Sequence, residues 1–302
     1  MHSIRRADHA GSWYTNNGKQ LLEEVQNYLN NAGSKKLGSK KIRAIIGPHA
    51  GLSYSGPTSG HAYKEIDASK ISKVFLLGPS HHFYLKNCAL SSAKIYETPI
   101  HNLNLDRDTI EALKSTGKFM VMSKAQDEEE HSLELHTPFI ASFVKENPEI
   151  KIVPILVGQG GVDAQKDMAS ILLPYFEDEK NLFVLSSDFC HWGQRFRYTN
   201  FYKDATDGKT SKIYKGIEAM DRHGMQIIER LDSNEFLEYL NETENTICGR
   251  NPISIFLQMV EMYHENASNE RVNMEFLDYS QSSEVKSADE SSVSYAAGCA
   301  YV

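Results

Sequence analysis

The chain has 302 residues, of which 40% are hydrophobic and 24% are charged. This composition is typical of a globular protein and excludes collagen-like, mostly disordered and coiled-coil chains. The net charge of −8 disfavours a nucleic-acid backbone as partner, because an acidic protein repels a polyanion. No apolar run approaches the ~20 residues that cross a bilayer, and the polar segment from Met1 to His9 is unlike a signal peptide. We therefore expect no membrane insertion.

The expected elements follow in chain order. They are a helix at 18–31, strands at 43–47 and 73–78, helices at 108–116 and 137–145, a strand at 151–157, a helix at 163–176, a strand at 181–185, a helical stretch at 211–241, and strands at 273–277 and 292–296. Asp232 is expected to break the long helical stretch by capping a second helix, and Pro252 to occupy the first position of a later one.

The alternation of strands and helices predicts an α/β fold, in which a mostly buried, mixed sheet is flanked by helices in one layered domain. The polar segments 33–41 and 280–292 are interpreted as exposed loops, because apolar periodic sequence resumes quickly on both sides. We find no internal repeat and no low-complexity linker. A single domain over residues 1–302 is therefore expected.

Ionisable side chains follow three of the expected strands. His49 comes after the first strand, His81 and His82 after the second, and Asp188 and His191 after the strand at 181–185. A single loop histidine is usually a surface residue. Ligands in open α/β sheets, however, bind outside the carboxyl ends of the strands. Three such loops on neighbouring strands predict a functional cleft.

Cys248 is a further candidate because it precedes an expected helix start, where the helix dipole favours a thiolate. The alternative is a buried structural cysteine, since none of the four cysteines forms a CxxC pair and a reducing, cytosolic setting fits best. If His49 and His81 converge with a carboxylate, the arrangement is that of non-haem iron sites. A thiolate favours copper or zinc and still allows Fe(II). Asp188 and His191 then serve as a ligand alternative or as an acid–base pair, with His191 the natural proton acceptor.

The segment 127–136 is rich in acidic residues and histidine. His131 and Glu134 are three residues apart and share a face if the segment is helical. An acidic run is usually a solvated face, and that is the simpler expectation. The alternative is that His131 or His136 lines the cleft beside the metal or the substrate.

The chain resembles the Memo family along nearly its whole length. The strings that carry the resemblance are HAGSWY (9–14), PHAG (48–51), LGPSHH (77–82), EH (130–131), SSDFCHWGQRFRY (186–198), NTICGR (245–250) and SSVSYAAG (291–298). The resemblance implies a fold like that of class III extradiol dioxygenases of the LigB type. It places His49, His81 and Cys248 at the metal-ligand positions, for one Fe(II) or copper ion per chain, with Asp188 and His191 beside them as the catalytic pair.

The resemblance also implies a function. Memo proteins are described as iron- or copper-binding redox proteins and as regulators or adaptors in growth-signalling, cytoskeletal and cell-motility pathways, in the cytoplasm and the nucleus. Their vestibule has been proposed to accept phosphotyrosine peptides, for which Arg195, Arg197 or Arg250 would be local clamps. The dioxygenases use a carboxylate as third ligand, so Cys248 at that position argues against ring cleavage.

Two hypotheses follow. The first is a metal-dependent redox protein with a regulatory role, in which His191 transfers protons and Asp188 orients it. The alternative is a non-catalytic adaptor that binds peptides or signalling proteins, with turnover left open. Hydrolysis at a zinc site is disfavoured, because the sequence shows no nucleophile or oxyanion motif.

Overall fold

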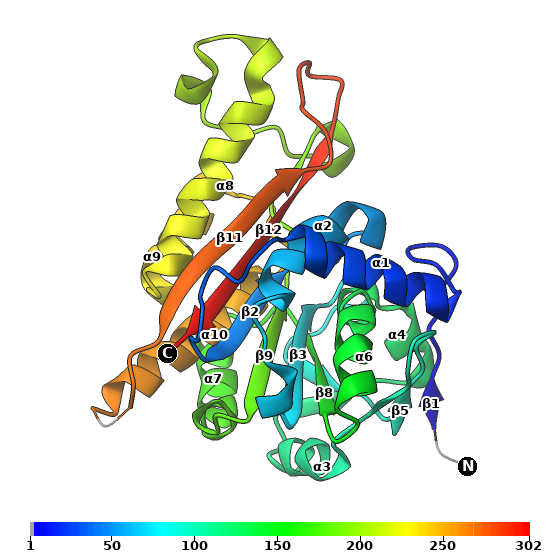
Figure 1. Ribbon diagram of the computed structural model, residues 1–302. Coiled ribbons are helices and arrows are strands. Elements are labelled where there is room, and N and C mark those ends of the chain that lie inside the picture. The colour runs from blue at the N-terminus through cyan, green and yellow to red at the C-terminus, as the bar shows by residue number, and fades with distance from the viewer. Residues whose placement is uncertain (1–2, 268) are drawn as a thin grey trace.

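A computed structural model describes residues 3–267 and 269–302; Met1 and His2, at the start of the polar amino-terminal segment, lie outside it. The described residues form a nine-stranded sheet in the order β10-β12-β2-β9-β3-β8-β4-β7, with β11 also paired to β12 (Figure 1). Its strands are β2 (Ile42–Gly47), β3 (Lys73–Pro79), β4 (Cys88–Leu90), β7 (Phe119–Val121), β8 (Lys151–Val157), β9 (Asn181–Ser186), β10 (His191–Trp192), β11 (Asn273–Gln281) and β12 (Ser292–Tyr301). A small second sheet contains β1 (Ile4–Arg5), β5 (Ile95–Tyr96) and β6 (Leu103–Asn104).

The sheet is mixed. Strands β2, β9, β3 and β8 run parallel to one another, whereas β12 and β4 pair antiparallel at either side of this group. Nearly every residue of the four parallel strands is buried. Because successive side chains point to opposite faces of a strand, both faces of this group are covered. The predicted α/β class with a mostly buried mixed sheet is confirmed, and the single-domain assignment stays a prediction.

Helices form the covering layers. They are α1 (Gly18–Asn31), α2 (Leu52–Tyr63), α3 (Arg107–Ser115), α4 (Lys124–Glu129), α5 (His131–Glu134), α6 (Thr137–Glu146), α7 (Val162–Glu177), α8 (Ile213–Glu229), α9 (Ser233–Thr243) and α10 (Arg250–Glu265). Short 3-10 turns are η1 (Ala68–Lys70), η2 (Gln194–Phe196), η3 (Lys203–Thr206) and η4 (Thr210–Lys212). Helix α1 packs on α2 and α6, while α10 packs on α7 and on strands β3 and β9. In Figure 1 the β11–β12 hairpin extends beyond the central strands and lies beside α8.

Helix α2 begins earlier than expected: the sequence was interpreted as a turn at Gly56 followed by a helix that carries His61, whereas the helix already begins at Leu52 and contains Gly56 and Pro57. The structure shows that the small residues serve packing. A Cβ on Gly56 would lie 2.5 Å from Cε2 of Tyr28, and one on Gly60 would lie 2.5 Å from the Tyr28 carbonyl oxygen. These two glycines let α2 approach α1 closely, and that packing holds the start of α2 just after His49.

Two predictions about helix ends have different outcomes. Asp232 caps α9 as expected, since its side chain accepts a hydrogen bond from the Glu235 N–H. The placement of Pro252 at the first helical position was wrong, because α10 begins two residues earlier, at Arg250. Pro252 is tolerated there because the N–H groups of the first helical turn have no carbonyl partner within the helix. Among the described residues, no helix combines the length and the apolarity needed to span a membrane.

Candidate metal centre

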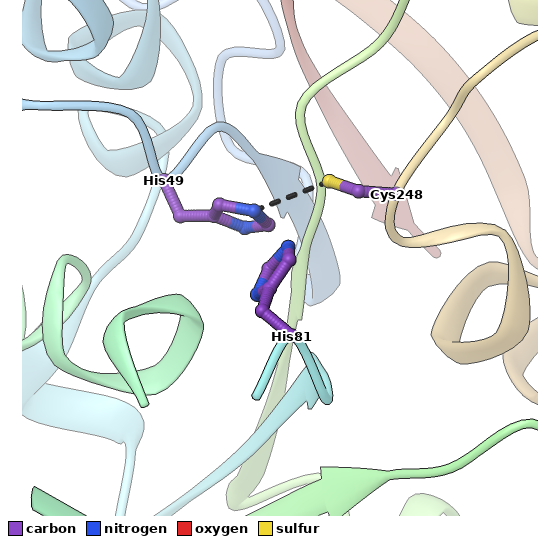
Figure 2. Close-up of side chains that lie close together, drawn as sticks. All are labelled: His49, His81 and Cys248. Carbon is purple, nitrogen blue, oxygen red and sulfur yellow. Dashed lines mark hydrogen bonds between the residues drawn. The ribbon is translucent and has the colours of Figure 1, made fainter. Parts of the chain in front are cut away.

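The candidate residues converge because of strand order. Strands β2, β9 and β3 are adjacent and parallel, so the loops after them leave the same edge of the sheet. These loops carry His49, Asp188 and His81, in that order across the sheet. Cys248 reaches the same place from the turn before α10. Figure 2 shows the side chains of His49, His81 and Cys248 pointing toward one another.

The geometry of these three side chains suits a metal ion. Cys248 Sγ lies 3.1 Å from Nε2 of His49, and one ligand atom from each of the three residues lies within 4.8 Å of the others. Ligands around a tetrahedral first-row ion, at ~2.0–2.3 Å from it, are about 3.5 Å apart. A small side-chain adjustment would therefore bring all three onto one ion. His49 is 1% exposed, and burial followed by the neighbouring His81 lowers its pKa well below the ordinary value, so the ring is neutral.

A hydrogen-bond chain fixes which nitrogen of His49 is free. The hydroxyl of Ser186 donates to the Ser132 carbonyl at 2.6 Å, which uses its only hydrogen. It must therefore accept from Nδ1 of His49, at 2.6 Å, and from Nε2 of His136, at 2.9 Å. His136 in turn accepts from the Tyr63 hydroxyl through Nδ1, at 2.9 Å. His49 thus carries its proton on Nδ1, which leaves the Nε2 lone pair facing Cys248, as a metal-ligating histidine requires.

A carboxylate fixes His81 in the same way. Glu130 accepts hydrogen bonds from Nδ1 of His81 at 2.9 Å, from the His81 backbone N–H at 2.8 Å and from the Ser132 N–H at 2.9 Å. Burial alone raises the pKa of Glu130, but the contacts with His81 outweigh it and hold the pKa at about 2. The ionised carboxylate therefore binds the Nδ1 proton and leaves Nε2 of His81 as the free ligand atom.

Cys248 and Asp188 are linked through the backbone. The Asp188 N–H donates to Cys248 Sγ at 3.2 Å, which stabilises negative charge on sulfur. Burial, and then the Asp188 carboxylate, raises the pKa of Cys248 well above its ordinary value, so binding of a metal ion would release the thiol proton. The Asp188 carboxylate accepts the N–H groups of His49, at 2.8 Å, and of Ala50, at 3.3 Å. Its Oδ1 thereby positions the backbone of the His49 loop.

His191 is oriented by main-chain groups. Its Nδ1 lies 2.9 Å from the Phe189 carbonyl and 3.2 Å from the Thr246 carbonyl, and because carbonyls only accept, Nδ1 carries the proton. Its backbone N–H donates to the Thr246 hydroxyl at 2.7 Å. Nε2 of His191 is therefore an acceptor, as the predicted proton-transfer role needs. Among the described residues, the hydrogen bonds of the ring go to carbonyls, so the orienting role expected for Asp188 belongs to Phe189 and Thr246.

Aromatic rings line one side of the cluster formed by His49, His81 and Cys248. The ring of His131 stacks on His81 at a centroid distance of 4.3 Å and on Trp13 at 4.6 Å. Burial and the nearby His81 lower the pKa of His131 to about 3. His9 packs against Trp13 and is held by Glu134 at 2.8 Å. His82 is more exposed and lies 3.6 Å from Glu129.

The acidic segment 127–136 departs from the expected solvated face. Glu130 and Glu134 are fully buried, and Asp127 is 1% exposed. Their charges are compensated by buried partners such as Arg5, which pairs with Glu134 and Asp127. His131 lines the cluster, as the alternative interpretation proposed. A second group of potential ligands, formed by His81, Glu130 and His131, shares His81 with the first.

Sequence reasoning missed three residues that prepare the site. Ser186 ends strand β9 and faces both His49 and His136, Glu130 binds His81, and Thr246 binds His191. All three lie within the strings that carry the family resemblance, but nothing in the sequence pattern indicated which residues they would contact. The partners themselves are 137 and 49 residues away along the chain.

The arginines suggested as phosphate clamps lie in different places. Arg195, with Phe196 and Tyr54, lines a pocket of about 340 Å³. Phe196 contacts His191 at a ring-centroid distance of 5.3 Å, so this pocket adjoins His191, beside the candidate ligands. Arg250 lines a separate pocket of about 480 Å³. Arg197 lines neither of these two pockets.

Comparisons with known sequences cover nearly the whole chain. The family model described as Memo-like protein matches residues 5–299. The protein MEMO1 of Xenopus tropicalis is 46% identical over 299 residues, which cover 99% of this chain and 97% of that protein. MEMO1 of Homo sapiens is 45% identical over 295 residues, covering 97% and 96%. The memo-1 homolog of Caenorhabditis elegans is 43% identical over 299 residues, covering 99% and 83%. The crystal structure of an uncharacterised protein of Escherichia coli K12 aligns with 83% of this chain and 98% of its own at 11% identity, with a TM-score of 0.47.

Proposed function

The chain belongs to the Memo-like protein family, and from this premise we propose that it is a metal-binding redox protein. His49, His81 and Cys248 would hold one Fe(II) or copper ion per chain. The observation that carries the proposal is the prepared donor set: two imidazoles, each with its Nδ1 engaged by a buried acceptor, and a thiol within 3.1 Å of one of them. Such preparation of ligand atoms is what metal-binding histidines require.

The donor set also bears on the choice of metal. Two imidazoles with a thiolate suit copper and iron, and zinc as well, better than hard ions such as Mg²⁺. An iron or copper ion at this place would supply one-electron chemistry. The protein contributes the surrounding functions: His191 offers an acceptor nitrogen for a proton, Asp188 holds the His49 loop, and the ring of His131, packed on Trp13, lines one side of the ligand group.

Residues around the cluster support a redox role more than a purely structural one. His49, Asp188 and Cys248 are ionisable residues that are buried next to one another, and their burial costs free energy of folding. A protein selected only for stability would avoid this cost. We propose that the cellular role is regulatory, in growth-signalling or cell-motility pathways. The family membership suggests this role.

Oxygen consumption in the presence of a reductant tests the redox role. Protein loaded with Fe(II) or with copper should consume oxygen, and Cys248→Ser should lose at least nine-tenths of this activity while it keeps the wild-type unfolding midpoint. His82→Ala, a more exposed histidine next to the cluster, should keep the activity. Equal rates in the wild type and in Cys248→Ser would contradict a redox role for the cluster.

The second candidate is an adaptor that uses the cleft to bind peptides without turnover. The pocket at Arg195, which adjoins His191 through Phe196, favours this reading because its arginine and nearby serines can bind an anionic group. Partner binding that is lost in Arg195→Gln but unchanged in Cys248→Ser would support the adaptor and separate it from the metal.

A further inference from the structure

The imidazole of His131 has no hydrogen-bond partner within the described part of the chain. The other histidines at the centre differ, because Nδ1 of His49, of His81 and of His191 each faces an acceptor. Oε1 of Glu130 lies 3.6 Å from Nδ1 of His131, which is longer than a hydrogen bond. A neutral imidazole carries one lone pair in its ring plane, and no donor occupies that lone pair here.

The ring of His131 is open to solvent on one side. Its side chain is 14% exposed, and the side chain of His81, on which it stacks, is 27% exposed. His49, the inner histidine, is 1% exposed. An ion in solution can therefore contact His131 and His81 before it contacts His49.

His131 also lies within reach of the metal ligands. One ligand atom from each of His81, Glu130 and His131 lies within 4.8 Å of the others. The ring centroid of His131 is 4.3 Å from that of His81 and 5.5 Å from that of His49. Because His81 belongs to both groups of potential ligands, an ion can keep one bond to the protein while it passes from one group to the other.

The orientation of the two rings favours passage over permanent binding. The rings of His131 and His81 are nearly parallel, at an angle of 25°. The lone pair of an imidazole lies in the plane of its ring, so stacked rings do not direct their lone pairs at one point. His131 must turn about its side-chain bonds to share an ion with His81, and no hydrogen bond opposes this rotation.

Glu130 supplies a negative charge that attracts a cation to this place. It accepts hydrogen bonds from His81 and Ser132, and no lysine or arginine of the described chain pairs with it. The nearby Glu134, in contrast, is paired with Arg5. A carboxylate without a cationic partner raises the local concentration of cations. The side chain of Glu130 has no exposed surface, so it acts through its charge and not as a ligand of the incoming ion.

We propose that His131 is an entry ligand, which together with His81 captures a first-row metal ion from solvent and passes it to the inner ligands. This inference rests on the metal centre proposed above. The ion exchanges the imidazole of His131 for His49 and Cys248. The thiol of Cys248 releases its proton to water in this step, and no electron is transferred.

A ligand that holds the ion only during passage has its own kinetic signature. It lowers the barrier to entry and, because exit follows the same route in reverse, also the barrier to exit. Its loss therefore slows association and dissociation by the same factor and leaves Kd unchanged. Loss of a permanent ligand acts differently, because it mainly accelerates dissociation and raises Kd.

Anaerobic stopped-flow mixing of metal-free protein with Fe(II) or with Cu(I) tests the proposal. The ultraviolet absorption of the bond between the ion and Cys248 reports association, and its loss after addition of excess chelator reports dissociation. His131→Phe keeps a ring against His81 and Trp13 but has no nitrogen. It should slow both association and dissociation about tenfold for either ion, with Kd within about twofold of the wild type.

His131→Met separates a ligand role from a packing role. Its thioether binds Cu(I) well and Fe(II) poorly. This variant should therefore recover nearly wild-type rates with Cu(I) but remain slow with Fe(II). A residue that only packs could not distinguish the two ions.

The matched control is His82→Ala. The ring of His82 also contacts His131, at a centroid distance of 5.9 Å, but in the described chain His82 belongs to neither group of potential ligands. This variant should keep the wild-type rates with both ions.

Three results would overturn the entry role and leave the metal centre intact. They are wild-type rates in His131→Phe, faster dissociation with a raised Kd in His131→Phe, and equal slowing of the two ions in His131→Met. Absence of the metal–thiolate absorption in the wild type would instead overturn the metal centre, and the entry role with it.

Discussion

Replacement of Glu130 by glutamine separates the charge of this side chain from its shape. The carboxylate accepts three N–H groups, two from His81 and one from Ser132. Its pKa is held at about 2, below the ordinary 4.5, although burial alone acts in the opposite direction. At 1.36 kcal/mol per pKa unit, this difference corresponds to about 3 kcal/mol of interaction with the charged form. The Glu130 carboxylate is fully buried, whereas the side chain of His81 is 27% exposed, so solvent screens part of this interaction.

A glutamine keeps one acceptor oxygen but places an NH₂ group against an N–H donor. Glu130→Gln should therefore lower the free energy of unfolding at neutral pH by about 2–3 kcal/mol. The Nδ1 proton of His81 also loses its anionic acceptor, and the ring is no longer fixed with Nε2 free. Loss of such a partner typically lowers metal affinity 10–100-fold.

Two assays check this prediction. Urea unfolding measures the stability change, and anaerobic calorimetry with Fe(II) or Cu(I) measures affinity. Glu129→Gln is the matched control. The carboxylate of Glu129, the residue before Glu130, is half exposed and lies 3.6 Å from Nδ1 of His82. It should change stability by less than about 1 kcal/mol and leave affinity unchanged. Wild-type metal affinity in Glu130→Gln would refute the argument that Glu130 prepares His81.

Three further predictions rest on buried contacts. Ser186→Ala removes the shared acceptor of His49 and His136 and should cost about 1–3 kcal/mol in urea unfolding; an unchanged midpoint would contradict the hydrogen-bond chain. Burial raises the pKa of Asp221 from 3.8 to about 6, so its stabilising contribution is complete below pH 3.8 and is lost as the pH rises through 6. Between about pH 4 and about pH 7.5 the wild type should lose about 3 kcal/mol relative to Asp221→Asn, and a pH-independent difference would contradict this. Gly60→Ala should cost about 2 kcal/mol or more, because its Cβ would lie 2.5 Å from the Tyr28 carbonyl, whereas Gly161→Ala, with nothing within 4 Å, should leave the thermal midpoint within about 2 °C.

The sequence alone predicted the parts of this structure that depend on local pattern. The buried strands were recognisable from continuous apolar runs, and the polar residues after them indicated that His49, His81 and Asp188 would meet. This worked because adjacent parallel strands end at one edge of the sheet. Cys248 was placed with them by the resemblance to the Memo family. Whether these residues ligate a metal stays a prediction.

Other features could not be predicted because they depend on contacts between distant segments. The sequence pattern of the acidic run gave no sign that Glu130 would bind His81, since a solvated face has the same composition. The start of helix α2 was misplaced because Gly56 is a poor helix former, and only the close approach of Tyr28 explains why a glycine lies inside the helix. The orienting partners of His191 are backbone carbonyls, which any sequence supplies.

Anaerobic calorimetric titration of metal-free protein with Fe(II) and with Cu(I) tests the central claim most directly. His49→Ala, His81→Ala and Cys248→Ala are titrated alongside the wild type, with His82→Ala as the control. The account predicts one ion per chain in the wild type and in His82→Ala, and a loss of affinity of at least 100-fold in each of the other three variants. Absence of binding in the wild type, or binding that is unchanged in those three variants, would contradict a metal centre at His49, His81 and Cys248.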